Sequence, residues 1–412
     1  MRLRELPVWK KNLIAVWITQ FLSIMGFAFC VPVLPYYIQE LGITDPDTIK
    51  LYTGLISFLP AISLGIMAPV WGAAADRFGK KIMLLRAMFF AFFILLALGF
   101  AVNATQILLI RLVQGLLTGT VAASYSLIAA GTPDDRMSYA LGIIASSIFI
   151  GNSSGLALGG IIADAVGYRM SFFIGAAMML AGLVFVMVAV KEIKGVSVSK
   201  TGVPKVRGIR NKLKALKTFA PVAVAILPMV FMVRVTRTIS DPYIPIYIQE
   251  IRNALEGSAS ISGIVRAVAS IATALAGIFI VRLGDKFNRY VLSAILLTIG
   301  AAFAVPLYFT NSLVLFTLFN FVVFLSIGGV DPIISSQASI MVTSEKRGVL
   351  FGLITMVGSF GWAVSPMIGS FISIRFSTKS IFLTFSAMML MTALVSLAIY
   401  TFRKKSGTIP NN

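Results

Sequence analysis

Residues 32–40 read PVLPYYIQE, and residues 242–250 read PYIPIYIQE. The two stretches share both prolines and the closing Tyr-Ile-Gln-Glu, at an offset of 210 residues (242 minus 32). Two further correspondences lie at nearly the same offset. Residues 76–80 read DRFGK and residues 285–289 read DKFNR, and the glycines Gly151, Gly155 and Gly159 return as Gly361, Ser365 and Gly369. Three separated matches at offsets of 209 or 210 residues predict an internal duplication of two similar halves.

Hydropathy places both halves in a membrane. The chain is 58% hydrophobic and 12% charged, with a mean hydropathy of +0.94, which lies outside the range of soluble domains. A bilayer-spanning helix needs about 20 mostly apolar residues. Such segments are 13–37, 51–74, 82–103, 105–130, 138–163, 170–190, 218–246, 258–281, 290–310, 312–342, 348–373 and 381–402. The fold predicted is an all-α membrane protein, with twelve transmembrane helices in two pseudo-symmetric six-helix bundles.

Charge between these segments predicts the topology. Basic residues gather in alternate loops, as the positive-inside rule expects of cytoplasmic loops, so both termini should be cytoplasmic. Residues 191–217 carry nine basic residues and one acid, Glu192, and are too polar to span a bilayer. The predicted domains are therefore residues 1–190, a basic cytoplasmic linker at 191–217 that lies against anionic lipid, and residues 218–412. Two halves with both termini on one side imply parallel repeats, with substrate bound near the midplane between them.

Composition also excludes other function classes. The net charge of +20 could suggest nucleic acid, but the basic residues stand in short bursts between apolar runs, so no nucleic-acid partner is expected. A single cysteine, Cys30, and no histidine leave no disulfide framework, no common metal site and no usual general base. An enzyme is therefore the least supported reading, and no metal is expected.

Three motifs resemble those of a known family. Residues 72–81, GAAADRFGKK, resemble the signature loop of the major facilitator superfamily; residues 111–115, RLVQG, resemble its proton-antiporter motif, and residues 151–160, GNSSGLALGG, its drug-exporter motif. The whole chain is similar to the twelve-helix bacterial drug:proton antiporters, in the multidrug-efflux branch. The resemblance implies a monomer in the inner membrane of a bacterial cell, driven by a proton gradient without a bound cofactor. Leu156 departs from the exporter motif, which usually has proline there; the second copy has Pro366.

Each motif also has a physical interpretation. Small residues four apart let membrane helices approach closely, so Gly151, Gly155 and Gly159, with Gly160, suit either a moving seam or plain tight packing. In the signature loop, glycines permit a tight turn, and Asp76 can pair with a basic side chain or accept hydrogen bonds from a helix N-terminus. The resemblance implies a conformational latch made of Gly72, Asp76, Arg77, Gly79 and Lys80.

Proton coupling without histidine requires a carboxylate. Of the 15 acids, only Asp241 and Asp331 lie well inside predicted spans, where an ionisable residue is a functional candidate. Arg234, Arg237 and Asp241 stand at i, i+3 and i+7, which predicts that they share one face of the seventh helix, as a proton site or as a packing ion pair. Asp331 lies in Gly-Gly-Val-Asp-Pro at 328–332, where the resemblance implies a functional acid.

Embedded arginines add to the predicted site. Arg111 occupies the arginine of the antiporter motif, and because arginine keeps its proton, it would tune a carboxylate or hold a water chain. Arg266 either faces the cavity or snorkels to the outer interface. Gln20 is a polar group of the first span, which has no acid. Arginines outnumber acids here, which favours an anionic, zwitterionic or neutral substrate over a lipophilic dication.

These observations predict a proton-coupled antiporter that exports small amphiphilic compounds by alternating access. Its partners would be the substrate, protons and the lipid bilayer. The alternative is a proton symporter or facilitator for a small metabolite such as an anion, and the direction of a pH-driven flux distinguishes the two. A membrane receptor or scaffold would not need the midplane acids.

Overall fold

The computed structural model describes residues 7–192, 220–340 and 347–405. Within these ranges the regular structure is helical and contains no strand, which confirms the predicted all-α class. The first half contains α1 (Val8–Cys30), α2 (Leu34–Glu40), α3 (Pro46–Phe78), α4 (Lys80–Gly99), α5 (Ala104–Leu117), α6 (Thr120–Gly131), η2 (Asp134–Arg136), α7 (Met137–Val166) and α8 (Tyr168–Ala189). The second half contains α10 (Ala220–Ile239), η3 (Asp241–Tyr243), α11 (Ile244–Arg252), α12 (Ser258–Leu275), η4 (Ala276–Ile280), η5 (Val281–Asp285), α13 (Arg289–Phe309), α14 (Leu313–Gly328), α15 (Val330–Ile340), α16 (Arg347–Arg375) and α17 (Ser380–Lys405).

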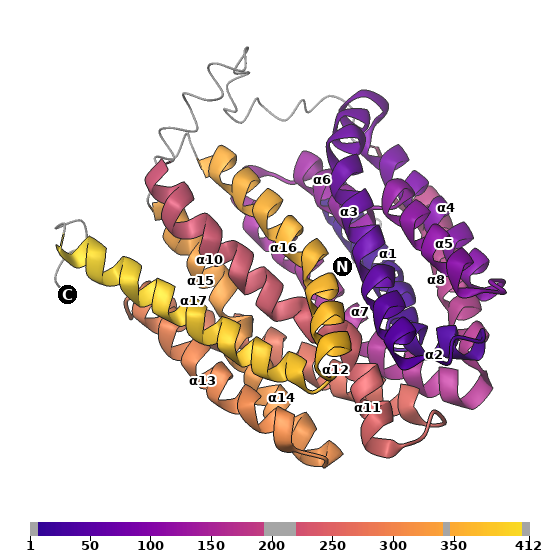
Figure 1. Cartoon of the computed structure of the whole chain (residues 1–412). Coiled ribbons are helices and arrows are strands. Elements are labelled where there is room, and N and C mark those ends of the chain that lie inside the picture. The colour runs from indigo at the N-terminus through magenta and orange to yellow at the C-terminus, as the bar shows by residue number, and fades with distance from the viewer. Residues whose placement is uncertain (1–6, 193–219, 341–346, 406–412) are drawn as a thin grey trace. The chain divides into compact units, whose positions relative to one another are not determined.

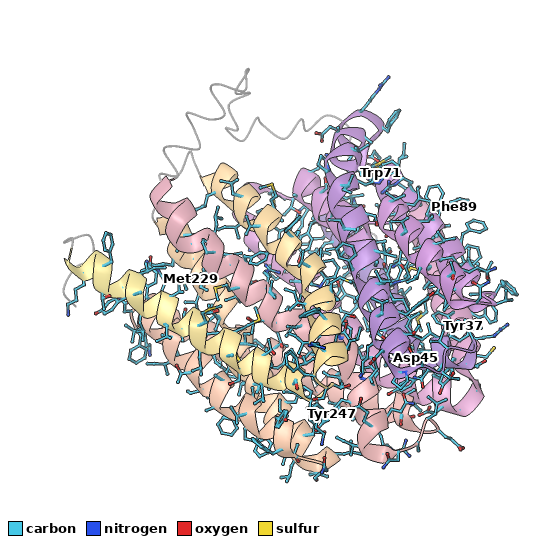
Figure 2. All side chains as sticks on the ribbon, viewed as in Figure 1. Tyr37, Asp45, Trp71, Phe89, Met229 and Tyr247 are labelled. Atoms are coloured by element: carbon cyan, nitrogen blue, oxygen red, sulfur yellow. The ribbon has the colours of Figure 1, made fainter. Side chains whose placement is uncertain are left out.

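The helices have the lengths and apolar character of membrane spans. Among the described residues, eleven stretches are long and apolar enough to cross a bilayer, and they correspond to eleven of the predicted segments. The remaining segment, 218–246, corresponds to α10. Large apolar side chains stay exposed along these helices, for example Phe89 and Phe93 on α4 and Val188 on α8. Figure 2 shows Phe89 projecting outward from α4, as expected of a side chain that faces lipid.

The first and seventh predicted segments are each broken in two. The prediction had continuous helices over 13–37 and 218–246, but α1 ends at Cys30 and α10 ends at Ile239. Pro32 and Pro242 follow these ends, and proline disrupts a helix interior because it has no N–H to donate. After each break the chain continues as a short helix, α2 or α11, with proline in its first turn. The repeated PxxP stretch therefore encodes a repeated helix break.

The fourth and tenth segments are broken as well. Gly119, at φ +123°, separates α5 from α6, and Gly329 separates α14 from α15. The second helix of each pair starts at Thr120 and at Val330, 210 residues apart (330 minus 120). A positive φ strains residues with a side chain, which accounts for glycine at 119. The duplication thus reappears in helix boundaries that hydropathy alone did not indicate.

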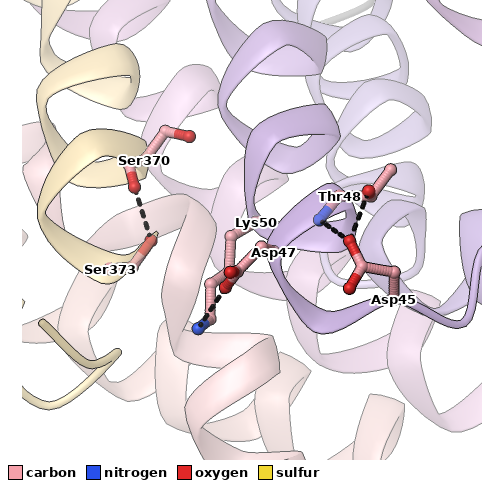
Figure 3. A network of polar contacts seen from close by, with 6 residues as sticks. All are labelled: Asp45, Asp47, Thr48, Lys50, Ser370 and Ser373. Carbon is pink, nitrogen blue, oxygen red and sulfur yellow. Dashed lines mark hydrogen bonds and ion pairs between the residues drawn. The ribbon is translucent and has the colours of Figure 1, made fainter. Parts of the chain in front are cut away.

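The long helix α3 starts at a well-formed cap. Asp45 Oδ2 accepts hydrogen bonds from the Thr48 amide, at 2.8 Å, and from the Thr48 hydroxyl (Figure 3). These bonds favour the charged carboxylate and lower the pKa of Asp45 below its usual value. One turn on, Lys50 pairs with Asp47 at 3.3 Å.

The described chain divides into two compact units. The first contains α1–α8, α11 and α12 through Ser270; the second contains α10, α12 from Ile271, η4, η5 and α13–α17. Within the first unit α1 packs against α7 and α8, and α3 against α5 (Figure 1). Within the second unit α10 packs against α16, and α13 against α14 and α17. The predicted division at 190 and 218 stays a prediction; of its linker, residues 193–217 lie outside the described residues.

Candidate functional site

Asp331 lies in the first turn of α15, just after the break at Gly329. Only 8% of its surface is exposed. The two preceding glycines allow α14 and α15 to approach α12 and η4: a Cβ on Gly328 would lie 2.9 Å from Thr273 Cα, and one on Gly329 would lie 2.8 Å from Ile280 Cγ2. A carboxylate at a helix N-terminus is stabilised by the helix dipole. The backbone around Asp331 is thus built to hold a buried acid.

Arg234 on α10 forms the ion pair of this acid. Arg234 Nη2 lies 2.7 Å from Asp331 Oδ2, with 38% and 11% of the two side chains exposed. The second arginine of α10, Arg237, also interacts electrostatically with Asp331, Arg234 and Asp241. The second unit therefore brings together two arginines and two acids from α10, η3 and α15.

The expected stripe of Arg234, Arg237 and Asp241 on one helix face is wrong at its third member. Helix α10 ends at Ile239, and Asp241 is the first residue of the 3₁₀ turn η3. The break before Pro242 ends the helical periodicity, so spacing within α10 does not apply to Asp241. The partner of Arg234 instead comes from α15, 97 positions away (331 minus 234).

Glycines on α16 make room for Arg234. A Cβ on Gly361 would lie 2.9 Å from the Phe231 carbonyl oxygen and 3.2 Å from Arg234 Cβ. The first repeat shows the same geometry: a Cβ on Gly151 would lie 2.9 Å from the Phe21 carbonyl oxygen and 3.3 Å from Ile24 Cβ. Phe21 and Phe231 are 210 residues apart, like Gly151 and Gly361. The repeats therefore share one helix crossing, and only the second has a charge there.

The other glycines of the predicted packing motif also lie at close crossings. A Cβ on Gly155 would lie 2.6 Å from the Met25 carbonyl oxygen, and one on Gly159 would lie 2.5 Å from Phe29 Cα, so both face α1. A Cβ on Gly160 would collide with the Ala259 carbonyl of α12, in the same unit. Leu156 is buried beside Ala28 in this seam. The motif thus packs α7 against two helices.

Arg111 and Arg266 line one small cavity in the first unit. The cavity measures about 50 Å³ and also includes Thr53 and Pro242. Arg111 Nε donates to the Ile56 carbonyl at 2.9 Å, and Nη1 donates to Gln114 Oε1 at 2.7 Å. Both of these hydrogen-bond acceptors of Arg111 are neutral groups. Arg266 lines this small cavity, and its predicted place, in the substrate cavity or at the outer interface, stays a prediction.

Gln20 is fully buried on α1. Its Oε1 accepts a hydrogen bond from the Ser124 hydroxyl of α6 at 2.7 Å. Its Nε2 has no hydrogen-bond partner among the described residues, although buried donors normally have one. One turn away, the Ser23 hydroxyl donates to Thr120 Oγ1 at 2.9 Å. Gln20 therefore lies in a polar seam between α1 and α6.

The predicted latch takes a shape that differs from the expected loop. Helix α3 continues to Phe78 and α4 starts at Lys80, so the turn is one residue, Gly79, at φ +103°. The expectation that Gly72 shares this turn is wrong, because Gly72 lies inside α3. Asp76 pairs with Lys80 one turn on, and the Arg77 guanidinium lies 5.3 Å from the Phe78 ring centre. Asp76 thus takes the basic partner rather than the helix N-terminus.

Glu192 caps the N-terminus of α4, a role that sequence analysis missed. Its Oε1 accepts from the Lys80 amide at 3.0 Å, and its Oε2 accepts from the Lys81 amide at 2.8 Å. The adjacent Lys191 backbone exchanges two hydrogen bonds of 2.9 Å with the Asn12 side chain of α1. A signal was present, since Glu192 is the one acid in a run of nine basic residues. The sequence alone instead places Glu192 in the basic linker that lies against anionic lipid.

Comparison with known proteins identifies the family of this chain. A model described as the Major Facilitator Superfamily matches residues 16–252 and 226–412, which together cover more than half of the chain. The chain belongs to the Major Facilitator Superfamily. It is a multi-pass membrane protein of a transporter superfamily, as the spanning helices also indicate.

Similar proteins in the superfamily carry efflux names. The chain is 29% identical over 366 residues to the "Multi-drug resistance efflux pump PmrA homolog" of Lactococcus lactis subsp. lactis (strain IL1403), with 89% of each chain covered. It is 27% identical over 388 residues to the "Multidrug resistance protein MdtG" of Klebsiella pneumoniae (strain 342), with 94% of this chain and 93% of that protein covered.

Solved structures of the superfamily share the fold. A bacterial homolog of the human lysosomal transporter Spinster superposes with a TM-score of 0.75 at 14% identity, over 98% of both chains. The nucleoside transporter NupG gives 0.73 at 14% identity, over 94% of this chain and 99% of that one. At these identities the likeness concerns the fold alone.

Glu192 supports a stability prediction about the signature loop of this superfamily member. Replacing Glu192 with alanine removes the acceptor of two α4 amides, so we expect a loss of about 1 kcal/mol in the free energy of unfolding. Unfolding of the purified protein in detergent measures this loss. Lys191→Ala is the matched control, because Asn12 binds only the backbone of Lys191. Equal stability of Glu192→Ala and Lys191→Ala would show that the cap is unimportant.

Proposed function

We propose that this chain is a proton-coupled antiporter that exports small amphiphilic compounds, drugs among them, by alternating access. The observation that carries the proposal is the ion pair of Arg234 and Asp331, at 2.7 Å, between two segments that the sequence predicts to span the membrane. A membrane-embedded ion pair is costly and is usually retained for function. The efflux names of similar proteins support drugs and related compounds as the exported substrates.

Protonation of the acid provides the coupling step. An ionised Asp331 attracts Arg234, whereas a protonated Asp331 loses that Coulomb attraction. Arg234 belongs to α10 and Asp331 to α15, so the proton changes what holds these two helices together. Asp241 is the second candidate carrier, beside Arg237. Arg111, whose guanidinium donates to the neutral Ile56 carbonyl and Gln114 side chain, is proposed to order water on the proton path.

A set of polar contacts supports alternating access. Gln39 of α2 and Gln249 of α11 exchange two amide hydrogen bonds, of 2.9 and 2.8 Å. The two glutamines are equivalent positions of the repeats. Nearby, the Tyr36 hydroxyl donates to the Pro245 carbonyl at 2.8 Å, and Asp164 accepts from the Ser260 amide at 2.7 Å. We propose that these bonds close the extracellular end and break when it opens.

The location and the substrate class are part of the same proposal. Basic loops support an inner-membrane protein with both termini in the cytoplasm. Arg111 and Arg266 in one cavity, and Arg234 and Arg237 on α10, support anionic, zwitterionic or neutral substrates. The protein is proposed to act as a monomer with substrate, protons and lipid as partners, and without a cofactor. Resistance limited to quaternary ammonium compounds would contradict this substrate class.

The direction of flux tests antiport against symport. Purified protein is reconstituted in liposomes, and uptake of a compound to which it confers resistance is followed with the lumen acid or alkaline relative to outside. We expect accumulation only with an acid lumen, because protons leaving drive the compound in, and we expect a protonophore to abolish it. Accumulation only with an alkaline lumen would establish the symporter instead.

A further inference from the structure

A cavity of about 300 Å³ lies between α3, α4 and α6 in the first unit, apart from the ion pair and from the cavity of Arg111. Its volume is within the range of small-molecule sites. Its lining includes Leu64, Trp71, Met83, Arg86, Thr118 and Ala122. Figure 2 labels Trp71 near the end of α3 that carries the signature turn, with Asp45 toward the opposite end.

Arg86 of α4 has unused hydrogen-bond donors in this cavity. Its guanidinium carbon lies 3.4 Å from the ring centre of Trp71, a cation–π contact. Its Nη2 donates to the Thr118 carbonyl at 3.3 Å. Its Nε and Nη1 are buried, and neither has a hydrogen-bond partner among the described residues. Buried donors without acceptors are costly, and the planar guanidinium matches a carboxylate or phosphate.

The N-terminus of α6 contributes a second feature that favours an anion. Helix α6 starts at Thr120 after Gly119, and no side chain caps it. The first amides of a helix lack intrahelical acceptors and attract negative charge. Gly119, Ala122 and Ala123 line the cavity with small side chains, which leaves the first turn accessible. Arg86, bonded to Thr118, stands beside this helix end.

The remaining wall is mostly apolar. Leu64, Ala68, Trp71 and Met83 line it. Asp76 also lies at the cavity, but its charge is paired with Lys80. A ligand that fits these surfaces has an anionic head and an apolar body.

We propose that this cavity binds an anionic amphiphile, with the head on Arg86 and the first turn of α6 and the apolar part on Leu64, Met83 and Trp71. The head is a phosphate or a carboxylate. The ligand could come from the membrane, as an anionic phospholipid, or from the transported compounds. The binding test does not depend on the proposed transport mechanism, because binding is measured on the purified protein.

Titration calorimetry with octyl phosphate in neutral detergent tests the site. Octyl glucoside is the ligand control with the same tail and no charge, and inorganic phosphate is the head alone. We expect octyl phosphate to bind more tightly than either control. Loss of a charge-assisted pair should make Arg86→Gln bind octyl phosphate about tenfold more weakly. Arg169→Gln is the matched control, because Arg169 also stacks on an aromatic ring, that of Tyr37, and also donates to a backbone carbonyl, that of Ala101.

A second pair of variants covers a folding failure of Arg86→Gln. Ala122→Leu fills the cavity and keeps Arg86, and Ala73→Leu adds the same bulk at an exposed position outside the lining. We expect Ala122→Leu to weaken octyl phosphate binding and Ala73→Leu to leave it unchanged. Equal affinity in wild type and Arg86→Gln, or in Ala122→Leu and Ala73→Leu, would overturn the proposal.

Competition identifies the source of the ligand. Displacement of octyl phosphate by dioctanoyl phosphatidylglycerol, but not by exported compounds, assigns the site to membrane lipid. Displacement by an exported anionic compound assigns it to cargo. Binding of octyl glucoside as tight as that of octyl phosphate would contradict an anion site altogether.

Discussion

We expect Asp331→Asn to abolish proton-driven export. The variant should therefore no longer protect an efflux-deficient strain against toxic compounds. Asparagine cannot take up a proton, and it leaves the Arg234 guanidinium without its ion-pair partner at 2.7 Å. Breaking a buried ion pair costs about 3–5 kcal/mol, and we expect the lower end because 38% of the Arg234 side chain is exposed. That cost concerns folding stability, so expression must be matched; the loss of the proton carrier itself is expected to reduce proton-driven flux by at least roughly a hundredfold, which corresponds to about 2.7 kcal/mol of barrier.

Growth on a panel of compounds and flux in liposomes measure this effect at equal expression. Asp47→Asn is the matched control, because it removes an acid from an exposed ion pair, that with Lys50. Asp331→Glu keeps the charge, and partial recovery of a pH-dependent flux would separate proton transfer from packing. Full pH-driven flux in Asp331→Asn would exclude Asp331 as the carrier. A selective loss in Asp241→Asn would then identify Asp241.

Crosslinking Gln39→Cys to Gln249→Cys should stop transport almost completely. The two amides donate to each other, so a short bifunctional methanethiosulfonate, which forms a disulfide with each cysteine, can bridge cysteines at these positions. If the contact must break in each cycle, a covalent bridge holds the protein in one state. We expect flux to fall more than about tenfold on crosslinking. Flux should return on reduction, because a reductant breaks the disulfides that hold the bridge.

The background and control for this experiment come from the chain itself. Cys30 is its single cysteine and is buried, so a Cys30→Ala background removes it. Crosslinking Asp45→Cys to Thr48→Cys bridges another hydrogen-bonded pair, within the cap of α3 (Figure 3), and should leave flux unchanged. Normal flux through a fully crosslinked Gln39–Gln249 pair would show that this contact does not open during transport.

Sequence and structure agree most where the signal is local. Apolar runs of about 20 residues predicted the spanning helices, because each run by itself is long enough to cross the hydrocarbon core as a helix. Glycines at 151, 155 and 159 predicted close helix crossings because a missing Cβ is a local property. The predicted turn at Gly72 is wrong because glycine permits a turn but does not require one. The residues around Gly72 continue α3 to Phe78.

The candidate site was only partly predictable. Asp331, Arg234 and Arg237 were recognised as embedded charges, because an ionisable residue in an apolar run is visible in the sequence. Their pairing was not, and Asp241 was placed on a helix that ends before it. Glu192 was assigned to a linker, although its carboxylate binds two amides more than 110 positions earlier in the chain.

By itself the sequence determined the membrane location, the duplication and the superfamily, since hydropathy, repeats and motifs are carried by neighbouring residues. Tertiary structure alone decided which polar groups meet: Asp331 with Arg234, Glu192 with the start of α4, and Gln39 with Gln249. Such pairs depend on how distant helices pack, and packing is set by small residues and helix breaks acting together. Spacing within one helix holds no information about a partner on another.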